Sequence, residues 1–303
     1  MSIQSPPVVI SGRRGGDLAV EIAAKLQSSL TPTQVIDFSD GNLYVQIQGE
    51  VRDREVVIVQ TLAGPQVHSD LMELAFLIDS ARGALAKRIT AVIPYFSYAK
   101  ADKHDHGGDA LRARVVARLL ESSGLDRVIM LDLHSSSIPG FFNIPVIELK
   151  ARELFCQHIK TQWDFDPAQT VVVSPDSGFA KNAWEYAMLL GTDMAVADKY
   201  RSDHSEKPHF HQLIGDVTGK RAIIVDDFST SGGTLIEAAR FLLENGASDV
   251  RAAISHLLLS GGAAEKIAAS PLQKILTTNS IPWLKPGDKL EVIGLSEILA
   301  QNI

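Results

Sequence analysis

The sequence predicts an α/β protein with mainly parallel sheets, and three observations support this fold class. Short runs of branched apolar residues, typical of buried strands, alternate with segments of helical periodicity along all 303 residues. Strands and helices follow each other at the spacings that the crossover connections of parallel strands require. Hydrophobic residues make up 45% of the chain, enough to form real cores, and the length predicts two domains.

The first half contains four predicted buried strands with helices between them. Residues 34–48 differ, because they alternate apolar and polar side chains around the turn Phe38-Ser39-Asp40-Gly41-Asn42, which predicts two paired strands. A polar loop covers residues 97–109. The apolar runs predict strands at 8–10, 55–61, 88–95 and 127–133, and helical spacing predicts helices at 17–26, at 69–86 and from the polar loop to 122.

The second half repeats the alternation. A charged loop at 199–211 interrupts it and is long enough to serve as a lid. The last strand, 290–293, and the last helix, 296–301, could return to either half. The other predicted elements are helices at 150–161, 179–190 and 235–245, a short helix after Gly261-Gly262, and strands at 170–173, 193–198, 222–225, 250–256 and 274–277.

The stretch RAIIVDDFSTSGGTL, residues 221–235, carries the most chemistry. The adjacent carboxylates Asp226 and Asp227 stand at the carboxyl end of a predicted strand, where parallel sheets bind ligands. The turn that follows, 229–234, opens a helix, and its backbone N–H groups are suited to a phosphate. Two carboxylates suit ribose hydroxyls or a hydrated Mg²⁺. The stretch predicts a sugar-phosphate site; the structural alternative is a Gly/Ser turn with an aspartate cap.

Polar side chains also follow other predicted strands. His134 ends the strand at 127–133, Asp176 follows the strand at 170–173, and Lys199 and Arg201 open the charged loop. Two cations in a lid above a phosphate site suit phosphoryl-group transfer, which depends on positioning and on neutralising charge. Each group has a structural alternative: a half-buried histidine, a helix cap and a solvated linker.

Composition excludes several other classes of function. The net charge of −7 argues against nucleic acid and anionic membranes as partners, and no apolar run approaches the ~18 residues of a membrane span. The single cysteine, Cys156, lies in a helical pattern, which predicts a packing residue and a reducing, cytoplasmic location. The loop histidines His204, His209 and His211 lack the spacing of a zinc site.

These segments together resemble the ribose-phosphate pyrophosphokinases, also called phosphoribosyl pyrophosphate (PRPP) synthetases, over nearly the whole chain. The loop 226–234 is similar to the family's DDIISTGGT loop, and the turn 38–41 is similar to its FSDGE turn. Further ordered matches are LMEL at 71–74, PYFSYA at 94–99, LDLH at 131–134, GFFNIP at 140–145, SPD at 174–176, DKYR at 198–201 and TNSIP at 278–282. The aspartate-rich loop alone would indicate only a phosphoribosyltransferase.

The resemblance implies two tandem phosphoribosyltransferase-type (Rossmann-like) domains. The first would cover residues 1–149, with a C-terminal segment of about 288–303 packing back on it, and the second would cover 150–287 and carry the PRPP loop. The implied reaction transfers pyrophosphate from MgATP to the C1 hydroxyl of ribose 5-phosphate and yields PRPP and AMP. The resemblance also implies self-association, as a dimer or a larger assembly up to a hexamer.

The resemblance assigns a role to each matching position. Lys199 and Arg201 would close over the transferred phosphates, and His134 and Asp176 would serve Mg²⁺ and the triphosphate. Ribose 5-phosphate would be held by Asp226, Asp227, Ser229, Thr230, Ser231, Gly232, Gly233 and Thr234. ATP would be bound by Phe38, Asp40 and Asn42 of a neighbouring subunit and by Lys100 and Asp102.

The nucleotide side departs from the family pattern. Asn42 replaces a glutamate, and Lys100-Ala101-Asp102 replaces Arg-Gln-Asp. Lysine lacks the planar fork of arginine, so stacking and bidentate phosphate contacts are weakened. The loop at 103–109 also matches poorly and is one residue shorter. We therefore expect catalysis to be kept and nucleotide affinity or choice to have changed.

Two other functions remain open at this point. A catalytically silent regulatory subunit should have lost metal or lid residues, whereas Lys199, Arg201, His134 and Asp176 are present. A phosphoribosyltransferase that consumes PRPP would share the loop but not the matches at 38–41, 131–134 and 278–282. Because the sequence ends at Ile303, without the longer tail of many relatives, we also expect weak or absent regulation by ADP.

Overall fold

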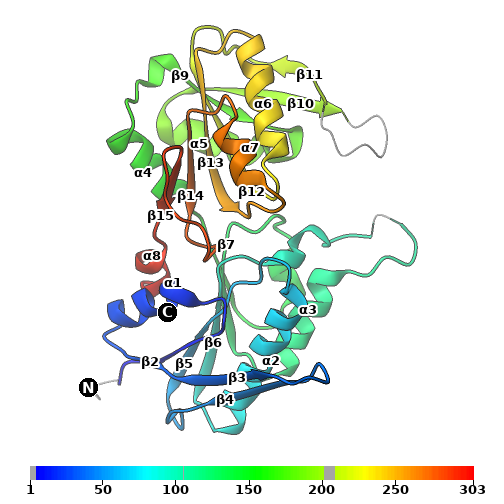
Figure 1. Cartoon of the computed structure of the whole chain (residues 1–303), viewed down its shortest axis with the longest axis vertical. Coiled ribbons are helices and arrows are strands. Elements are labelled where there is room, and N and C mark those ends of the chain that lie inside the picture. Colours follow the sequence, from blue (N-terminus) through cyan, green and yellow to red (C-terminus); the bar gives the residue numbers. More distant parts are fainter. Residues whose placement is uncertain (1–4, 105, 201–208) are drawn as a thin grey trace. The chain divides into compact units, whose positions relative to one another are not determined.

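The computed structural model describes residues 5–104, 106–200 and 209–303. The chain divides into two compact units (Figure 1). The first extends to Leu149 and includes residues 279–282 and 294–303, and the second comprises residues 150–278 and 283–293. Both units alternate strands and helices around mainly parallel sheets, which confirms the predicted fold class.

The first unit is built on a parallel sheet with the strand order β2-β1-β5-β6-β7-β8. A separate antiparallel hairpin, β3 (Thr33–Asp37) and β4 (Leu43–Ile47), packs on helix α2. The strands are β1 (Val8–Ser11), β2 (Leu30–Thr31), β5 (Glu55–Val59), β6 (Arg88–Ile93), β7 (Arg127–Leu131) and β8 (Val146–Leu149). The helices are α1 (Gly16–Lys25), α2 (Val67–Gly83), α3 (Arg112–Ser122) and α8 (Ser296–Ala300), with short 3₁₀ turns η1 (Ser97–Lys100) and η2 (Ile138–Phe141).

The second unit has the strand order β11-β10-β9-β12-β13-β14-β15, and every neighbouring pair is parallel except β10 and β11. The strands are β9 (Thr170–Ser174), β10 (Asp193–Tyr200), β11 (His209–Ile214), β12 (Arg221–Ser229), β13 (Asp249–Leu257), β14 (Lys274–Thr278) and β15 (Leu290–Ile293). The helices are α4 (Arg152–Gln162), α5 (Ala180–Leu190), α6 (Gly233–Glu244) and α7 (Ala263–Ala268), with 3₁₀ turns η3 (Pro167–Gln169) and η4 (Ser177–Phe179).

The two sheets follow the same topology. In the first unit, β1 has β2 on one side and β5 to β8 in chain order on the other. In the second unit, β9 likewise has β10 on one side and β12 to β15 in chain order on the other. The pairing registers agree as well, so β5 is the counterpart of β12 and β1 of β9. When the two sheets are aligned by these registers, Arg13 falls at the position that corresponds to Asp176. Gln60 and Thr61 fall at the positions that correspond to Asp226 and Asp227.

Each sheet is buried within a core of its own. The strands contribute continuous apolar runs, as expected when helices cover both faces of a parallel sheet. In the first unit fully buried Ile10 and Ile58 pack with Leu74 of α2, and in the second Ile224 packs with Leu242 of α6. Within the described ranges, no helix is long and apolar enough to cross a membrane.

The structure differs from the sequence-based expectation in two segments. The charged loop was expected at 199–211, but β10 continues to Tyr200 and β11 begins at His209, so strands occupy both of its ends. The C-terminal segment was expected to join the first domain from about residue 288, but β15 pairs in parallel with β14 on the second sheet. The return to the first unit begins at Gly294. Residues 279–282 also belong to the first unit, where the Thr61 hydroxyl donates to the Ser280 carbonyl at 2.7 Å.

Glu291 of β15 is held by three neighbours. Its Oε2 accepts a hydrogen bond from Trp163 Nε1 at 2.9 Å and lies 2.7 Å from His158 Nε2, and its other oxygen pairs with Lys274. Burial alone would raise the pKa of Glu291, but the hydrogen bonds from Lys274, Trp163 and His158 outweigh it and lower the pKa to about 2. The ionised carboxylate therefore stabilises this edge of the sheet.

We expect Glu291→Gln to destabilise the protein by about 2 to 3 kcal/mol at neutral pH. Because the folded pKa is depressed, this stabilisation is present above the unfolded pKa of about 4.5 and disappears as the pH falls towards 2. Urea unfolding of wild type and variant at several pH values would measure it. Asp193→Asn, which breaks an exposed pair with Lys220 in the same unit, is the control and should change little. Equal losses from Glu291→Gln at pH 7 and pH 3 would contradict the explanation.

Candidate active site

The carboxyl end of the second sheet gathers the acidic groups. Asp176 follows β9 directly, and its side chain caps η4 by accepting a hydrogen bond from the Phe179 N–H at 3.1 Å. Asp226 and Asp227 lie within β12, which continues to Ser229 instead of ending at Val225 as the apolar run predicted. The structural alternative for Asp176 is thus realised, but its position among the other carboxylates remains.

The charges of these carboxylates act on one another. Burial raises the pKa of Asp226 well above its usual value, and the negative charges of Asp227 and Asp176 raise it further. Asp227 is buried, and its Oδ1 accepts the N–H of Phe228 at 2.8 Å. Concentrated negative charge at the end of a sheet is unfavourable unless a cation or a hydrogen-bond donor neutralises it. This edge therefore favours a cationic or hydroxyl-bearing ligand.

The donor set fits Mg²⁺ that arrives with a substrate. Mg²⁺ prefers hard oxygen ligands and commonly takes only one or two carboxylates, with waters and substrate phosphates completing its shell. Across the described part of the chain, no three His, Cys, Asp or Glu side chains are arranged as a metal site. His134 belongs to the first unit and Asp176 to the second, so their joint role in metal binding remains a prediction.

The turn after β12 leads into the N-terminus of α6. The Thr230 carbonyl accepts a hydrogen bond from the Ser260 N–H at 2.9 Å, which fixes the turn against the segment after β13. Gly232 is the N-cap residue and has a φ of 72°, in the left-handed region that favours glycine. No side chain caps this helix, so no cap would compete with an anion for its first N–H groups.

A Cβ atom at Gly232 would approach Ile267 Cδ1 to 3.0 Å. The backbone angle therefore favours glycine at this point of the turn, and a larger residue would also need Ile267 to shift by a few tenths of an ångström. Ser229 is buried, whereas Thr230 is exposed. The turn therefore presents an open face that has the backbone donors and hydroxyl groups expected of a phosphate site.

Lys199, one of the two predicted lid residues, lies in β10, next to β9 in the same sheet. β10 pairs with β9 as far as Val196 and Ser174, and it then continues past the end of β9 to Tyr200. The backbone of Lys199 is thereby carried beyond the carboxyl edge that bears Asp176. A register irregularity between Asp198 and Lys199 interrupts the pairing with β11 at this point. Arg201, the second predicted cation, lies outside the described residues.

In the first unit, the predicted nucleotide residues occupy the hairpin turn. Gly41, with a φ of 89°, donates its N–H to the Phe38 carbonyl at 3.0 Å. Asp40 Oδ1 accepts the Asn42 N–H at 3.0 Å and Oδ2 accepts its side-chain amide at 2.9 Å, and these bonds lower the pKa of Asp40. Phe38 is 50% exposed and contacts Tyr44 edge-on. Asn42 thus orders the turn and leaves the Phe38 ring open to a ligand.

The remaining predicted residues lie beyond β6 and β7, which are neighbours in the first sheet. Lys100 is exposed at the end of η1, Asp102 is half-buried, and Ala101 is buried. His134 is exposed and follows β7. Parallel neighbouring strands bring their carboxyl ends to one edge, so Lys100 and His134 both lie beyond the same edge of this sheet.

Arg13 has no role predicted from the sequence. The structure links it to Glu73 at 2.6 Å and to Asp37, the residue before Phe38, at 2.6 Å. The available signal was a pair of arginines directly after a predicted strand, but their partners are distant in sequence. Arg13 therefore contacts the hairpin directly before the turn 38–42.

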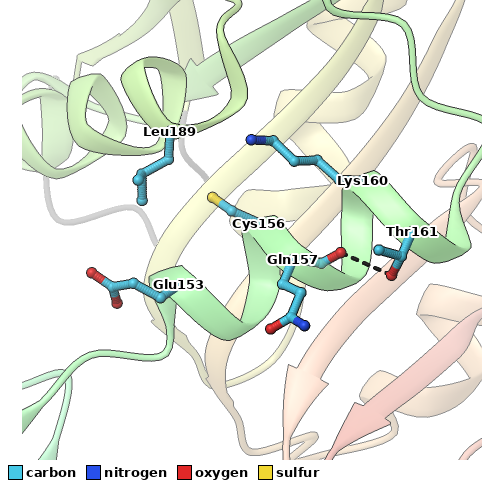
Figure 2. A pocket seen from close by; sticks show the side chains of 6 residues that line it. All are labelled: Glu153, Cys156, Gln157, Lys160, Thr161 and Leu189. Carbon is cyan, nitrogen blue, oxygen red and sulfur yellow. Dashed lines mark hydrogen bonds between the residues drawn. The ribbon is translucent and has the colours of Figure 1, made fainter.

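A groove between α4 and α5 is lined by none of the predicted site residues. Figure 2 shows Cys156 of α4 and Leu189 of α5 on its two sides. Burial raises the pKa of Cys156 to about 12, so the thiol stays protonated at neutral pH and lacks the reactivity of a thiolate. This agrees with the predicted packing role. The groove is lined by Glu153, Cys156, Gln157, Lys160, Thr161 and Leu189.

Comparisons with known proteins agree with the predicted resemblance. Residues 7–124 match the N-terminal domain of ribose phosphate pyrophosphokinase, and residues 200–303 match the phosphoribosyl synthetase-associated domain. Ribose-phosphate pyrophosphokinase A of Dictyostelium discoideum is 39% identical over 97% of this chain and 93% of its own. Ribose-phosphate pyrophosphokinase 2 of Schizosaccharomyces pombe is 40% identical over 97% and 92%.

A solved structure is similar over the whole fold. The crystal structure of phosphoribosylpyrophosphate synthetase from Mycobacterium smegmatis superimposes with a TM-score of 0.91 at 33% identity. The match covers 98% of this chain and 97% of that one. Both units and their order are therefore shared with that protein.

Proposed function

The chain belongs to the ribose-phosphate pyrophosphokinase family, and we propose that it transfers the pyrophosphate group of ATP to the C1 hydroxyl of ribose 5-phosphate. The products are PRPP and AMP, and the reaction supplies nucleotide biosynthesis. The observation that supports this assignment within the chain is the carboxyl edge of the second sheet. There the uncapped N-terminus of α6 lies directly beyond the carboxylates of β12.

We propose that ribose 5-phosphate binds at this edge. The N–H groups of residues 232–234 and the hydroxyl groups of Ser229, Thr230, Ser231 and Thr234 would hold the 5-phosphate, with the helix N-terminus adding a favourable dipole. Asp226 and Asp227 would accept hydrogen bonds from the ribose hydroxyl groups. Bound in this way, the sugar presents its C1 hydroxyl in a fixed position, which is the main requirement of a direct displacement.

The transfer itself depends on neutralising negative charge. Lys199 and Arg201 would contact the β- and γ-phosphates of ATP, and their charges would stabilise the group in transfer and the departing AMP. His134 and Asp176 would serve Mg²⁺ and the triphosphate. Mg²⁺, when bound, would polarise the phosphate oxygens. No covalent enzyme intermediate is needed, because the sugar hydroxyl attacks the β-phosphorus in line.

We propose that ATP is read by the hairpin turn of a neighbouring subunit. The half-exposed Phe38 ring offers a stacking surface for adenine, and Asp40 and Asn42 present hydrogen-bonding groups beside it. Lys100 and Asp102 would contact the same nucleotide. The enzyme would then require at least a dimer, and a hexamer is the larger assembly that we propose. Its buried free thiol, Cys156, suits a reducing compartment, and we propose a cytoplasmic location.

A coupled assay for AMP formation from MgATP and ribose 5-phosphate tests this function. Wild type should form AMP only when ribose 5-phosphate is present. A PRPP-consuming phosphoribosyltransferase would instead release pyrophosphate from PRPP and a base. A wild-type protein that forms no AMP, although it binds both substrates, would indicate the regulatory subunit.

Nucleotide choice is the property in which we expect this enzyme to differ from its family. Asn42 carries no charge, and Lys100 cannot make the bidentate contact of an arginine. Rates with ATP, GTP, CTP and UTP should therefore differ by less than about tenfold in kcat/KM, or the KM for ATP should be raised. Replacing Lys100 by arginine should sharpen the preference for ATP. Strict ATP preference with an ordinary KM in wild type would contradict this prediction.

A further inference from the structure

Arg13 connects two elements of the first unit that are otherwise distant in sequence. Its backbone N–H and its Nε donate to Glu73 Oε1 and Oε2 at 2.7 and 2.6 Å, and Glu73 of α2 is fully buried. Its Nη1 donates to Asp37 Oδ2 at 2.6 Å, and its Nη2 reaches the Ser69 hydroxyl at 3.3 Å. The guanidinium group thus links the body of the unit to the last residue of β3.

We propose that Arg13 is a positioning residue for the nucleotide-binding turn, and that it acts by anchoring the β3–β4 hairpin through Asp37. The inference rests on the proposed function, because it assumes that the turn 38–42 contacts ATP. It goes beyond that function by assigning a role to a residue that contacts no substrate.

The hairpin needs such an anchor. β3 and β4 form a two-stranded sheet of their own, and isolated two-stranded hairpins are marginally stable (Figure 1). Val45 and Ile47 of β4 pack against the core, which holds the base of the hairpin. The last pair before the turn is Asp37 with Leu43, and Asp37 is the residue that Arg13 contacts. The contact therefore restrains the hairpin next to Phe38.

Arg13 is itself held rigidly. A planar guanidinium that is already bound to a buried carboxylate loses little further entropy when it makes another ion pair. Typical exposed ion pairs contribute little because both side chains must be ordered. Here only Asp37, with a side chain 64% exposed, has to be ordered. This pair should therefore be stronger than most exposed pairs.

The loop that carries Arg13 is the counterpart of the loop that carries Asp176, but its backbone is used differently. The Arg13 N–H binds Glu73, and the Arg14 N–H binds Gln60 Oε1 at 2.9 Å. Gly12 and Gly15 pack so closely on Gln60 and on the Val59 carbonyl that a Cβ would approach them within 2.6 Å. Protein side chains thus accept hydrogen bonds from the backbone N–H groups of this loop, which indicates a structural use.

The test compares Asp37→Ala with a matched control. Asp37→Ala removes only the ion pair between Arg13 and the hairpin and leaves the ion pair between Arg13 and Glu73. We expect the KM for ATP to rise about fivefold, because the turn 38–42 would be in its binding position in a smaller fraction of the molecules. The kcat and the KM for ribose 5-phosphate should stay within about twofold of the wild-type values. Asp37→Glu should restore the wild-type KM. The control Glu297→Gln removes a similarly exposed carboxylate, paired with Lys25, and should change neither KM.

A double-variant cycle identifies Arg13 as the partner. Arg13→Gln should raise the KM for ATP at least as much as Asp37→Ala, and adding Asp37→Ala to it should have no further effect. An unchanged KM for ATP in an active Asp37→Ala protein, or equal changes in both KM values, would overturn the inference. If wild type forms no AMP, the proposed function fails instead. Calorimetric binding of ATP then decides the inference, since Asp37→Ala should still weaken that binding.

Discussion

Replacing Lys199 by alanine should lower kcat about a thousandfold while leaving both KM values nearly unchanged. The reason is that the lysine would meet the phosphates most strongly when negative charge develops during transfer, and an interaction made only in the transition state affects kcat alone. The backbone supports this role, because β10 carries Lys199 past the end of β9 and the ladder with β11 is irregular at that residue.

Steady-state kinetics with MgATP and ribose 5-phosphate measure the effect. Lys220→Ala is the matched control, because Lys220 lies just before the amino end of β12 and pairs with Asp193 at 2.7 Å. That variant should keep the wild-type kcat. Lys199→Arg keeps the charge and should recover part of the lost activity. A decrease of less than tenfold in Lys199→Ala would show that this lysine is not the cation of the transfer step.

Asp226→Asn should separate stability from activity. In the free protein, burial and the neighbouring charges of Asp227 and Asp176 disfavour the ionised Asp226, so the neutral amide should raise the free energy of unfolding. The same change removes a carboxylate that would accept a ribose hydroxyl. Loss of a charge-assisted hydrogen bond should lower kcat/KM for ribose 5-phosphate about a hundredfold.

The pH dependence of this effect has a definite sign. Because the folded pKa of Asp226 lies above its unfolded value, the folded state binds a proton at pH values where the unfolded state has lost it. Wild type therefore loses stability as the pH rises from about 4 through the raised pKa, and Asp226→Asn should lose less over that range. Urea unfolding from pH 4 to pH 8 measures the difference.

Asp249→Asn is the control for this variant. Asp249 lies at the amino end of β13 and pairs with Arg221 at 2.8 Å, so removing its charge should destabilise the protein. Opposite effects on stability from two aspartates on neighbouring strands would show that an ionised carboxylate is unfavourable at Asp226 and favourable at Asp249. If Asp226→Asn also destabilises the protein, burial and repulsion do not disfavour the ionised Asp226 in the folded state.

The fold could be predicted because buried parallel strands are encoded as continuous apolar runs. The strands at 8–10, 127–133 and 170–173 were found from such runs and agree with β1, β7 and β9. The carboxyl ends of the two strands at the candidate site, β12 and β10, were predicted too early in the chain. Residues 226–229 and 199–200 are mainly polar, yet they continue β12 and β10, because the pairing with β13 and β11 continues through them.

The candidate site could be predicted only where its residues are close in sequence. The turn 229–234 and the aspartates before it form one continuous motif, and the structure places them at one edge of one sheet. Arg13 could not be connected to Asp37 or Glu73, because no periodicity links residues that are 24 and 60 positions apart. The roles of the nucleotide residues remain predictions that rest on the family resemblance.

No single cut in the chain separates the two units. The first unit takes its segments from three separate parts of the chain, since residues 279–282 and 294–303 return to it after the second sheet has been started. A fragment that ends at Leu149 would lose α8, which packs on α1, and the Ser280 carbonyl that the Thr61 hydroxyl binds. Neither unit is therefore a single contiguous stretch of the chain. The last two segments of the first unit follow most of the second unit along the chain.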